Sequence, residues 1–338
     1  MSSPSNFPFS VVQQKAFIGS ALHSTMLLQF LFGIYTGVFP CTIYIYSHRE
    51  NSTVRTDKIV IGSITALYTV IVSQVLLNWF YTGIIFCAKG ETRLHMFIEN
   101  VTLEALPTGV RLSITILNVC GFAFADGLLV WRCFHACGRS FWRSSLPIAL
   151  FFVEIVLIIL STTYECMLLT RPGFDTPLML RVKTYANAAM FVSVPATSLI
   201  STIIICRQIY AHALPGCRSW KRYRTIINAL VESSGLYSAP VVFMAVLDLM
   251  GTGQIQSSFT PEMISLYVNV IVVITAGLGP TGMIAQLFLT SGLEDSERSS
   301  ISLPSEHISR PSLTNNEPRI NSEGGDNKTG QQSSYLGG

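Results

Sequence analysis

The chain has 338 residues, of which 49% are hydrophobic and only 12% are Asp, Glu, Lys or Arg. A soluble globular domain carries roughly 25% charged residues, and charges this sparse cannot cover the surfaces of two soluble domains. The net charge of +3 is spread along the chain in short basic runs, which argues against a nucleic-acid-binding protein. These numbers exclude a soluble fold and indicate a protein that folds in a lipid bilayer.

Seven apolar runs are long enough to cross a hydrocarbon core of about 30 Å, which takes about 20 helical residues. We therefore predict an all-α integral membrane protein, built as a seven-transmembrane helix bundle. The predicted helices cover residues 23–47, 59–86, 112–133, 146–169, 185–210, 226–250 and 263–289. Residues 1–22 are an extracellular N-terminal segment, and we interpret the first helix as an uncleaved signal anchor because no short apolar stretch with a cleavage site precedes it.

Orientation is predicted from the basic residues of the loops, because Lys and Arg next to the membrane favour the cytoplasmic side. One face holds twelve such residues and the other holds seven. This count places the N-terminus outside and the C-terminus inside. Residues 290–338, rich in Ser, Gly, Asn and charge, are predicted to form a disordered cytoplasmic tail. Its serines are either phosphorylated in a regulated docking segment or simply solvated.

The outer side offers two candidate modifications. Asn100 begins a glycosylation sequon in the loop after the second helix, although a second sequon, at Asn51, lies on the inner side. Cys87 and Cys166 end two helices on the same outer face, so they form either a disulfide or two free thiols. Cysteines near inner helix ends are interpreted as reduced thiols, either palmitoylated or buried as small apolar side chains.

Several signatures of known chemistry are missing from the sequence. The seventh apolar segment has no lysine for a retinal Schiff base, and there is no Gly-rich phosphate loop, HExxH pair or GxSxG elbow. The six histidines and eight cysteines do not show the spacing of a metal site. We therefore expect no enzymatic activity, no cofactor and no metal.

The most informative residues are three acids inside predicted helices, since an unpaired ionisable group in a bilayer costs several kcal/mol. They are Asp126, Glu154 and Glu232, in the third, fourth and sixth helices. A rise of 1.5 Å per residue puts them about 10, 12 and 9 Å from the inner helix ends, at similar depth. With no base at that depth, they are protonated, share a proton or cation, or are reached by Arg132 and Arg207.

Three roles are open for this predicted intramembrane layer. It locks the helices together through hydrogen bonds, with local hydroxyls as partners, namely Ser233, Ser234, Tyr237 and Ser238. Alternatively, it switches between two packings of the bundle as buried pairs break and re-form. The third role is a relay for protons or cations.

A second group of residues lies near the outer helix ends. It can line an extracellular pocket for a small cationic or amphipathic ligand, or it can be an aromatic belt with solvated helix ends. Its members are Asn78, Trp79, Tyr81, Glu165 and Asp248.

Two further features concern the seventh helix and the inner loops. Proline removes a backbone donor and glycine removes side-chain support, which predicts a hinge or close helix packing at Gly277, Gly279, Pro280 and Gly282.

Basic residues at the inner helix ends are candidates for coupling to a cytosolic partner, or for setting orientation and touching anionic lipid. They are Arg132, Arg207, Arg218, Lys221, Arg222 and Arg224.

Two stretches resemble a known family. The first stretch, residues 126–155, reads DGLLVWRCFHACGRSFWRSSLPIALFFVEI, and the second, residues 222–240, reads RYRTIINALVESSGLYSAP. They are similar to the third and sixth helices, respectively, of a large set of uncharacterised seven-helix membrane proteins of basidiomycete fungi. The resemblance covers roughly residues 16–290 and implies a fold and a lineage, with a layout like that of G-protein-coupled receptors. It marks Asp126, Arg132, Pro147, Arg222, Tyr223, Glu232, Ser233 and Tyr237. Family A receptor motifs are absent, since Val-Trp-Arg-Cys-Phe stands in place of Asp/Glu-Arg-Tyr and no Asn-Pro-x-x-Tyr occurs.

Together these features predict a receptor-like sensor, in the plasma membrane or an endomembrane, that binds a small extracellular ligand and signals through its inner loops and tail. The first alternative is a proton-coupled or lipid-handling transporter that uses the intramembrane carboxylates. The second is a membrane scaffold without transport or signalling. The expected partners are the lipid bilayer, a small-molecule ligand and a cytosolic signalling protein.

Overall fold

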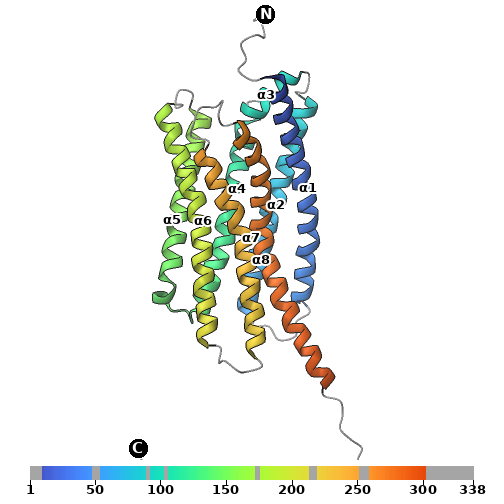
Figure 1. Cartoon of the computed structure of the whole chain (residues 1–338), viewed down its shortest axis with the longest axis vertical. Coiled ribbons are helices and arrows are strands. Elements are labelled where there is room, and N and C mark those ends of the chain that lie inside the picture. Colours follow the sequence, from blue (N-terminus) through green and yellow to red (C-terminus); the bar gives the residue numbers. More distant parts are fainter. Residues whose placement is uncertain are drawn as a thin grey trace, which may run out of the picture. The chain divides into compact units, whose positions relative to one another are not determined.

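The computed structural model describes residues 10–47, 54–88, 92–102, 106–171, 176–212, 219–250 and 259–301. The chain divides into two units, residues 1–296 and 297–338, and the helix bundle belongs to the first. All regular structure in the described ranges is helical (Figure 1). The helices are α1 Val11–Ser47, α2 Val54–Gly83 with a π-helical turn Ile84–Ala88, α3 Arg93–Thr102, α4 Thr108–Ala136, α5 Phe141–Thr170, α6 Pro177–His212, α7 Ser219–Met250 and α8 Phe259–Ile301.

Seven of these helices are long and apolar enough to cross a bilayer, which makes the chain an integral, multi-pass membrane protein. Their spanning parts hold 27 to 35 residues each. At 1.5 Å per residue they measure roughly 40–52 Å, so their ends extend past a hydrocarbon core of about 30 Å. The predicted seven-helix fold is confirmed, and each helix extends beyond its predicted bounds at one end or both. Residues 302–338, most of the predicted tail, lie outside the described residues.

The start of α1 shows why the predicted bounds were too short. The helix begins at Val11, twelve residues before the predicted start at residue 23. Ser10 and Gln13 form a capping box there: the Gln13 N–H donates to Ser10 Oγ at 3.3 Å, and the Ser10 N–H donates to Gln13 Oε1 at 2.8 Å. This exchange satisfies two backbone donors at the helix end, and its Ser-x-x-Gln spacing is visible in the sequence.

The short helix α3, in the loop between α2 and α4, was not predicted. Thr92 Oγ1 accepts the His95 N–H at 3.2 Å and so caps its first turn. Phe97 is buried and packs edge-on against Phe17 of α1, with ring centroids 5.7 Å apart. Figure 1 shows α3 beside the beginning of α1. We call this end of the bundle the outer end, in keeping with the predicted orientation, and the opposite end the inner end.

The bundle is arranged around α4, which packs against α2, α5 and α6, while α6 also packs against α5 and α7. Close contacts through glycines fix the position of α8. A Cβ added at Gly279 would lie 3.6 Å from the Ser233 carbonyl oxygen of α7, and one added at Gly277 would meet Ile71 of α2 and Tyr35 of α1. These contacts place α8 between α7 and the α1–α2 pair.

Three clusters of buried apolar side chains fill the bundle. One joins α1, α2 and α8 around Tyr35, and another joins α4, α6, α7 and α8 around Cys133 near the inner end. The third, which we call the plug, lies at the centre. It consists of Phe122, Ala125, Val194, Tyr237, Val241, Met244, Leu247, Val268, Val272 and Ala276.

Candidate functional site

Two buried acids face each other where α4 packs against α5. Asp126 and Glu154 both have 0% exposed surface, and their carboxyl groups lie within range of electrostatic interaction. The Tyr237 hydroxyl donates to Asp126 Oδ2 at 3.1 Å. Asp126 Oδ1 and both Glu154 oxygens have no hydrogen-bond partner in the described part of the chain. Because buried polar atoms are nearly always paired, these three oxygens mark a candidate site.

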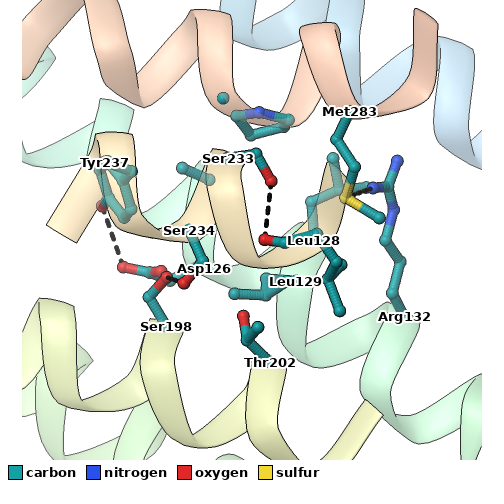
Figure 2. Close-up of a pocket in the computed structure, with 14 residues that line it drawn as sticks. Asp126, Leu128, Leu129, Arg132, Ser198, Thr202, Ser233, Ser234, Tyr237 and Met283 are labelled. Atoms are coloured by element: carbon teal, nitrogen blue, oxygen red, sulfur yellow. Dashed lines mark hydrogen bonds between the residues drawn. The ribbon is translucent and has the colours of Figure 1, made fainter. Parts of the chain in front are cut away.

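The Asp126 carboxyl borders a cavity of about 30 Å³ between α4, α6, α7 and α8, which we call the inner cavity. Hydroxyl side chains are set into a wall that is otherwise largely apolar. Ser198 Oγ of α6 and Ser234 Oγ of α7 lie 3.3 Å apart and share a hydrogen bond, whereas Thr202 Oγ1 of α6 is buried without one. Figure 2 shows these three side chains beside the Tyr237–Asp126 hydrogen bond.

The contribution of α6 was not predicted. Ser198 and Thr202 are four residues apart and therefore lie on one face of the helix, as do Thr197 and Ser201. All four are buried. The four-residue spacing was a usable signal, but it does not show which helix these hydroxyls face.

Arg132 lines the inner cavity but does not neutralise the acids. It lies six residues after Asp126, about 9 Å farther along α4, and its Nη1 donates to Met283 Sδ at 3.1 Å. Within the described residues, neither Asp126 nor Glu154 takes part in a salt bridge. Arg207 is exposed on α6. The prediction that these two arginines reach the acids is therefore not supported by the geometry.

The third predicted acid, Glu232, lies apart from the pair. Its side chain is on the exposed face of α7, together with Asn228 and Leu236. Measured along each helix from its observed inner end, Asp126, Glu154 and Glu232 lie at depths of roughly 15, 20 and 20 Å, so their depths remain similar. Their directions around the helix axis differ. Glu232 precedes Tyr237 by five residues, so its side chain points about 140° away from that of Tyr237 around the α7 axis. The predicted layer of three acids is a pair in the structure.

The remaining predicted coupling residues lie at the inner end. Arg207 and Arg224 are exposed near the inner ends of α6 and α7. Lys221 and Arg222 belong to the first turn of α7, and their side chains are outside the described part. Arg218 falls outside the described residues altogether. Their coupling role stays a prediction.

At the outer end, α6, α7 and α8 enclose a cleft of about 230 Å³, which we call the outer cleft. Asp248 of α7, Glu262 of α8 and Lys183 of α6 line it. The Lys183 ammonium is already ion-paired with Glu165 of α5. Three carboxylates therefore face one ammonium group, and the outer cleft carries an excess of negative charge.

The predicted extracellular pocket changes in composition. Asp248 lines the outer cleft, and Glu165 forms an ion pair with Lys183, which also lines it. The α2 residues lie elsewhere: Trp79 is 64% exposed, and the Tyr81 hydroxyl donates to Asn100 Oδ1 of α3 at 3.1 Å. Asn78, on the same part of α2, is not among the residues that line the cleft. Trp79 follows the aromatic-belt alternative, whereas Tyr81 is held by α3 and Asn78 Oδ1 is buried without a hydrogen-bond partner among the described residues.

At the two candidate modification sites, the structure has a buried Asn100 and, of the two alternatives for the cysteines, free thiols. Asn100 is buried in α3, and its Nδ2, the atom that would carry a glycan, donates to the Met96 carbonyl at 3.0 Å. Cys87 and Cys166 are both free thiols. The physical reason is that α4 packs between α2 and α5, which carry the two cysteines at their outer ends. Shared membrane depth alone did not bring them together.

The plug separates the outer cleft from the inner cavity. Leu247 belongs to the plug and to the wall of the outer cleft, while Ala125 and Tyr237 belong to the plug and to the wall of the inner cavity. Leu247 follows Tyr237 by ten residues along α7, a length of about 15 Å. Packed apolar side chains occupy this length, so the two sites face opposite ends of the bundle.

Comparison with known proteins leaves the family open. The chain matches no protein-family model, and no curated protein sequence matches it. The resemblance to fungal seven-helix proteins therefore stays a prediction from motifs. In the described residues, no group of three or more His, Cys, Asp or Glu side chains is placed to hold a metal ion. The chain is an integral membrane protein with seven candidate spanning helices, a charged outer cleft and a buried acid pair beside an inner cavity.

Proposed function

We propose that the protein is a receptor-like sensor of the plasma membrane, of fungal lineage, that binds a small extracellular ligand and responds by repacking its inner half. The observation that carries this proposal is the separation of the two sites by the plug. A sensor needs an outer site that communicates with the inner end without letting solutes pass. A packed apolar centre between two polar sites is consistent with that requirement.

The charge of the outer cleft indicates the class of ligand. Asp248 and Glu262 line the cleft, and its one lysine, Lys183, is shared with a third carboxylate, Glu165. Leu180, Leu247 and Pro261 supply apolar surface in the same cleft. Opposite charge beside apolar surface favours a small amphipathic amine, because its ammonium group pairs with the acids and its carbon skeleton covers the apolar wall.

Helix α7 is the element best placed to transmit the signal. It carries Asp248 at the outer cleft, Tyr237 at the inner cavity, and Lys221, Arg222 and Arg224 in its first turns at the inner end. Pro240 lies inside the helix between the two sites and cannot donate a backbone hydrogen bond, which weakens the helix there. Movement of the outer half of α7 about Pro240 would change how Tyr237 meets Asp126.

The transporter alternative requires a hydrated path through the acid pair, and the plug argues against one. A scaffold would use the acids only to lock helices, and then their replacement would change stability alone. A scaffold predicts no ligand-dependent change at the inner end. A transporter does change there as it exposes its site to either side in turn, but it also predicts pH-gradient-driven flux in proteoliposomes, which a sensor does not show.

The test begins with binding. The purified protein in lipid nanodiscs is heated with phenethylamine, tyramine or spermidine, and the unfolding temperature is followed. We expect a saturable rise with at least one amine, and a tenfold or greater loss of apparent affinity in Asp248→Asn and Glu262→Gln. Glu232→Gln is the matched control, since its carboxyl lies on the exposed face of α7, away from the outer cleft.

The second part of the test measures signalling. Spin labels at the inner ends of α6 and α7 should report a change in the distance between them when an amine that binds is added. Nucleotide exchange on fungal Gα subunits should also rise. If no amine binds, or if Asp248→Asn binds as well as the parent, the outer cleft is not the ligand site. Binding without any inner response would contradict the sensor.

A further inference from the structure

We propose that the inner cavity is a binding site for a single sodium ion, held by Asp126 and by hydroxyl oxygens of α6 and α7. This site is independent of the outer cleft and of any ligand bound there. It rests on three observations: unpartnered oxygens, the size of the cavity, and uncompensated charge.

The first observation concerns the oxygen atoms. Asp126 Oδ1 and Thr202 Oγ1 border the cavity, their side chains are 0% and 4% exposed, and neither atom has a hydrogen-bond partner in the described residues. Ser198 and Ser234 add a hydroxyl pair on the same wall. Since only one proton lies between those two hydroxyls, each oxygen keeps a lone pair for a cation. Carboxylate and neutral oxygen ligands are those that hard cations prefer.

The second observation is the size of the site. The cavity measures about 30 Å³. One water molecule needs roughly 10–15 Å³ measured in this way, so the cavity holds a single small ion together with one water. Sodium, which is smaller than water, fits this space better than potassium does.

The third observation is the charge around the site. From α4 come Asp126 and Arg132, and from α5 comes Glu154. Helix α7 contributes Tyr237, while the lining residues of α6 and α8 are uncharged. Arg132 is bonded to Met283, so its guanidinium stands at the inner end of the cavity instead of at the acids. Two carboxyls packed together without a base are stabilised by protonation, by sharing a proton or by a cation, and a sodium ion beside Asp126 is the third of these.

The proposal predicts that sodium stabilises the folded bundle, because the site exists only when α4, α6 and α7 are packed. The purified protein in nanodiscs is heated in NaCl and in KCl at constant ionic strength. We expect a saturable rise of about 2–5 °C in unfolding temperature with sodium, and a smaller one with potassium. Binding of radioactive ²²Na⁺ should reach one ion per chain.

Variants locate the effect. Asp126→Asn should abolish both the sodium-dependent rise and ²²Na⁺ binding. In case that variant folds poorly, Thr202→Val and Ser198→Ala each remove one oxygen and should weaken apparent sodium affinity about fivefold or more. Glu232→Gln is the control for an acid at similar depth outside the cavity, and Asp248→Asn is the control for the outer cleft; both should keep the full sodium response.

Two results would overturn the sodium site. One is an unfolding temperature of the parent protein that does not differ between sodium and potassium, with no ²²Na⁺ bound. The other is a sodium response that persists in Asp126→Asn, Thr202→Val and Ser198→Ala. Failure of amines to bind the outer cleft would leave the sodium site standing, and the reverse also holds, because Asp248→Asn and Asp126→Asn separate the two.

Discussion

At the scale of single residues, Tyr237 connects the plug to the acid pair. Its ring is packed in the plug, and its hydroxyl donates to Asp126 Oδ2 at 3.1 Å. A hydrogen bond from a buried hydroxyl to a carboxyl is stronger than one between exposed groups, since no water competes for it. The same side chain therefore contributes to the stability of the centre and to the position of Asp126.

Replacing Tyr237 by Phe tests this contact. The substitution keeps the ring in the plug and removes only the hydroxyl, so the free energy of unfolding should fall by about 1–3 kcal/mol. Stepwise denaturation with SDS in mixed micelles measures it. Tyr185→Phe is the control, because the ring of Tyr185 is 61% exposed, and the change there should stay within about 0.5 kcal/mol. Equal effects in the two variants would show that the Tyr237 hydroxyl contributes nothing specific.

At the scale of helices, α8 shows which of its glycines lies at a close helix contact. The helix runs without interruption through Gly277, Gly279, Pro280 and Gly282. An added Cβ at Gly277 would overlap Ile71 Cδ1 and lie 3.0 Å from the Tyr35 ring, whereas one at Gly282 would meet nothing within 4 Å. Close packing thus explains Gly277, and motion about Pro280 stays a prediction.

A pair of glycine substitutions tests the packing of α8. Gly277→Ala should lower the free energy of unfolding by about 1–3 kcal/mol, because Ile71 and Tyr35 must move to make room. Gly282→Ala adds the same methyl group in open space and should instead raise it by about 0.5–1 kcal/mol through helix propensity. Thermal unfolding in nanodiscs measures both variants. A stabilising Gly277→Ala would mean that α8 does not approach α1 and α2 this closely.

At the scale of the whole bundle, two polar sites lie at opposite ends of an apolar centre. The outer cleft is large and acidic, and the inner cavity is small and bordered by Asp126. Which end faces the outside of the cell follows from the distribution of basic residues, which favours an external N-terminus. The functional assignment of the two sites depends on this orientation.

Cys87 provides a direct test of orientation. Its thiol is free and exposed at the outer end of α2. A fluorescent, membrane-impermeant maleimide added to intact spheroplasts should label the protein without prior reduction, and Cys87→Ser should remove that label. Labelling only after permeabilisation would mean that the bundle is inverted. Labelling only after reduction would mean that Cys87 is part of a disulfide.

The helices could be predicted from the sequence because spanning a bilayer depends on local composition. A run of about 20 apolar residues satisfies the requirement whatever its neighbours are. The short helix α3 escaped prediction because it is held by a tertiary contact, Phe97 on Phe17. The capping box at Ser10 and Gln13 was present in the sequence, and it fixes the first turn of α1 outside the hydrophobic run.

The site was predicted less completely, for a geometric reason. Depth along a helix follows from residue number, and on that basis Asp126, Glu154 and Glu232 belong together. The direction of a side chain around the helix axis depends on which helices pack beside it, and this separates Glu232 from the other two. The same dependence hid Thr202, whose position on α6 has meaning only once α6 faces Asp126.

The lipid solvent, the number of spanning helices and the depth of each polar residue could all be predicted, because they are set by the order of side chains along one segment. Which polar groups meet depends on how the helices pack. Asp126, Glu154 and Tyr237 come from three helices, and the excess acidity of the outer cleft comes from residues of α5 through α8. Contacts between distant segments are fixed by the packing of whole helix faces, which no single segment encodes.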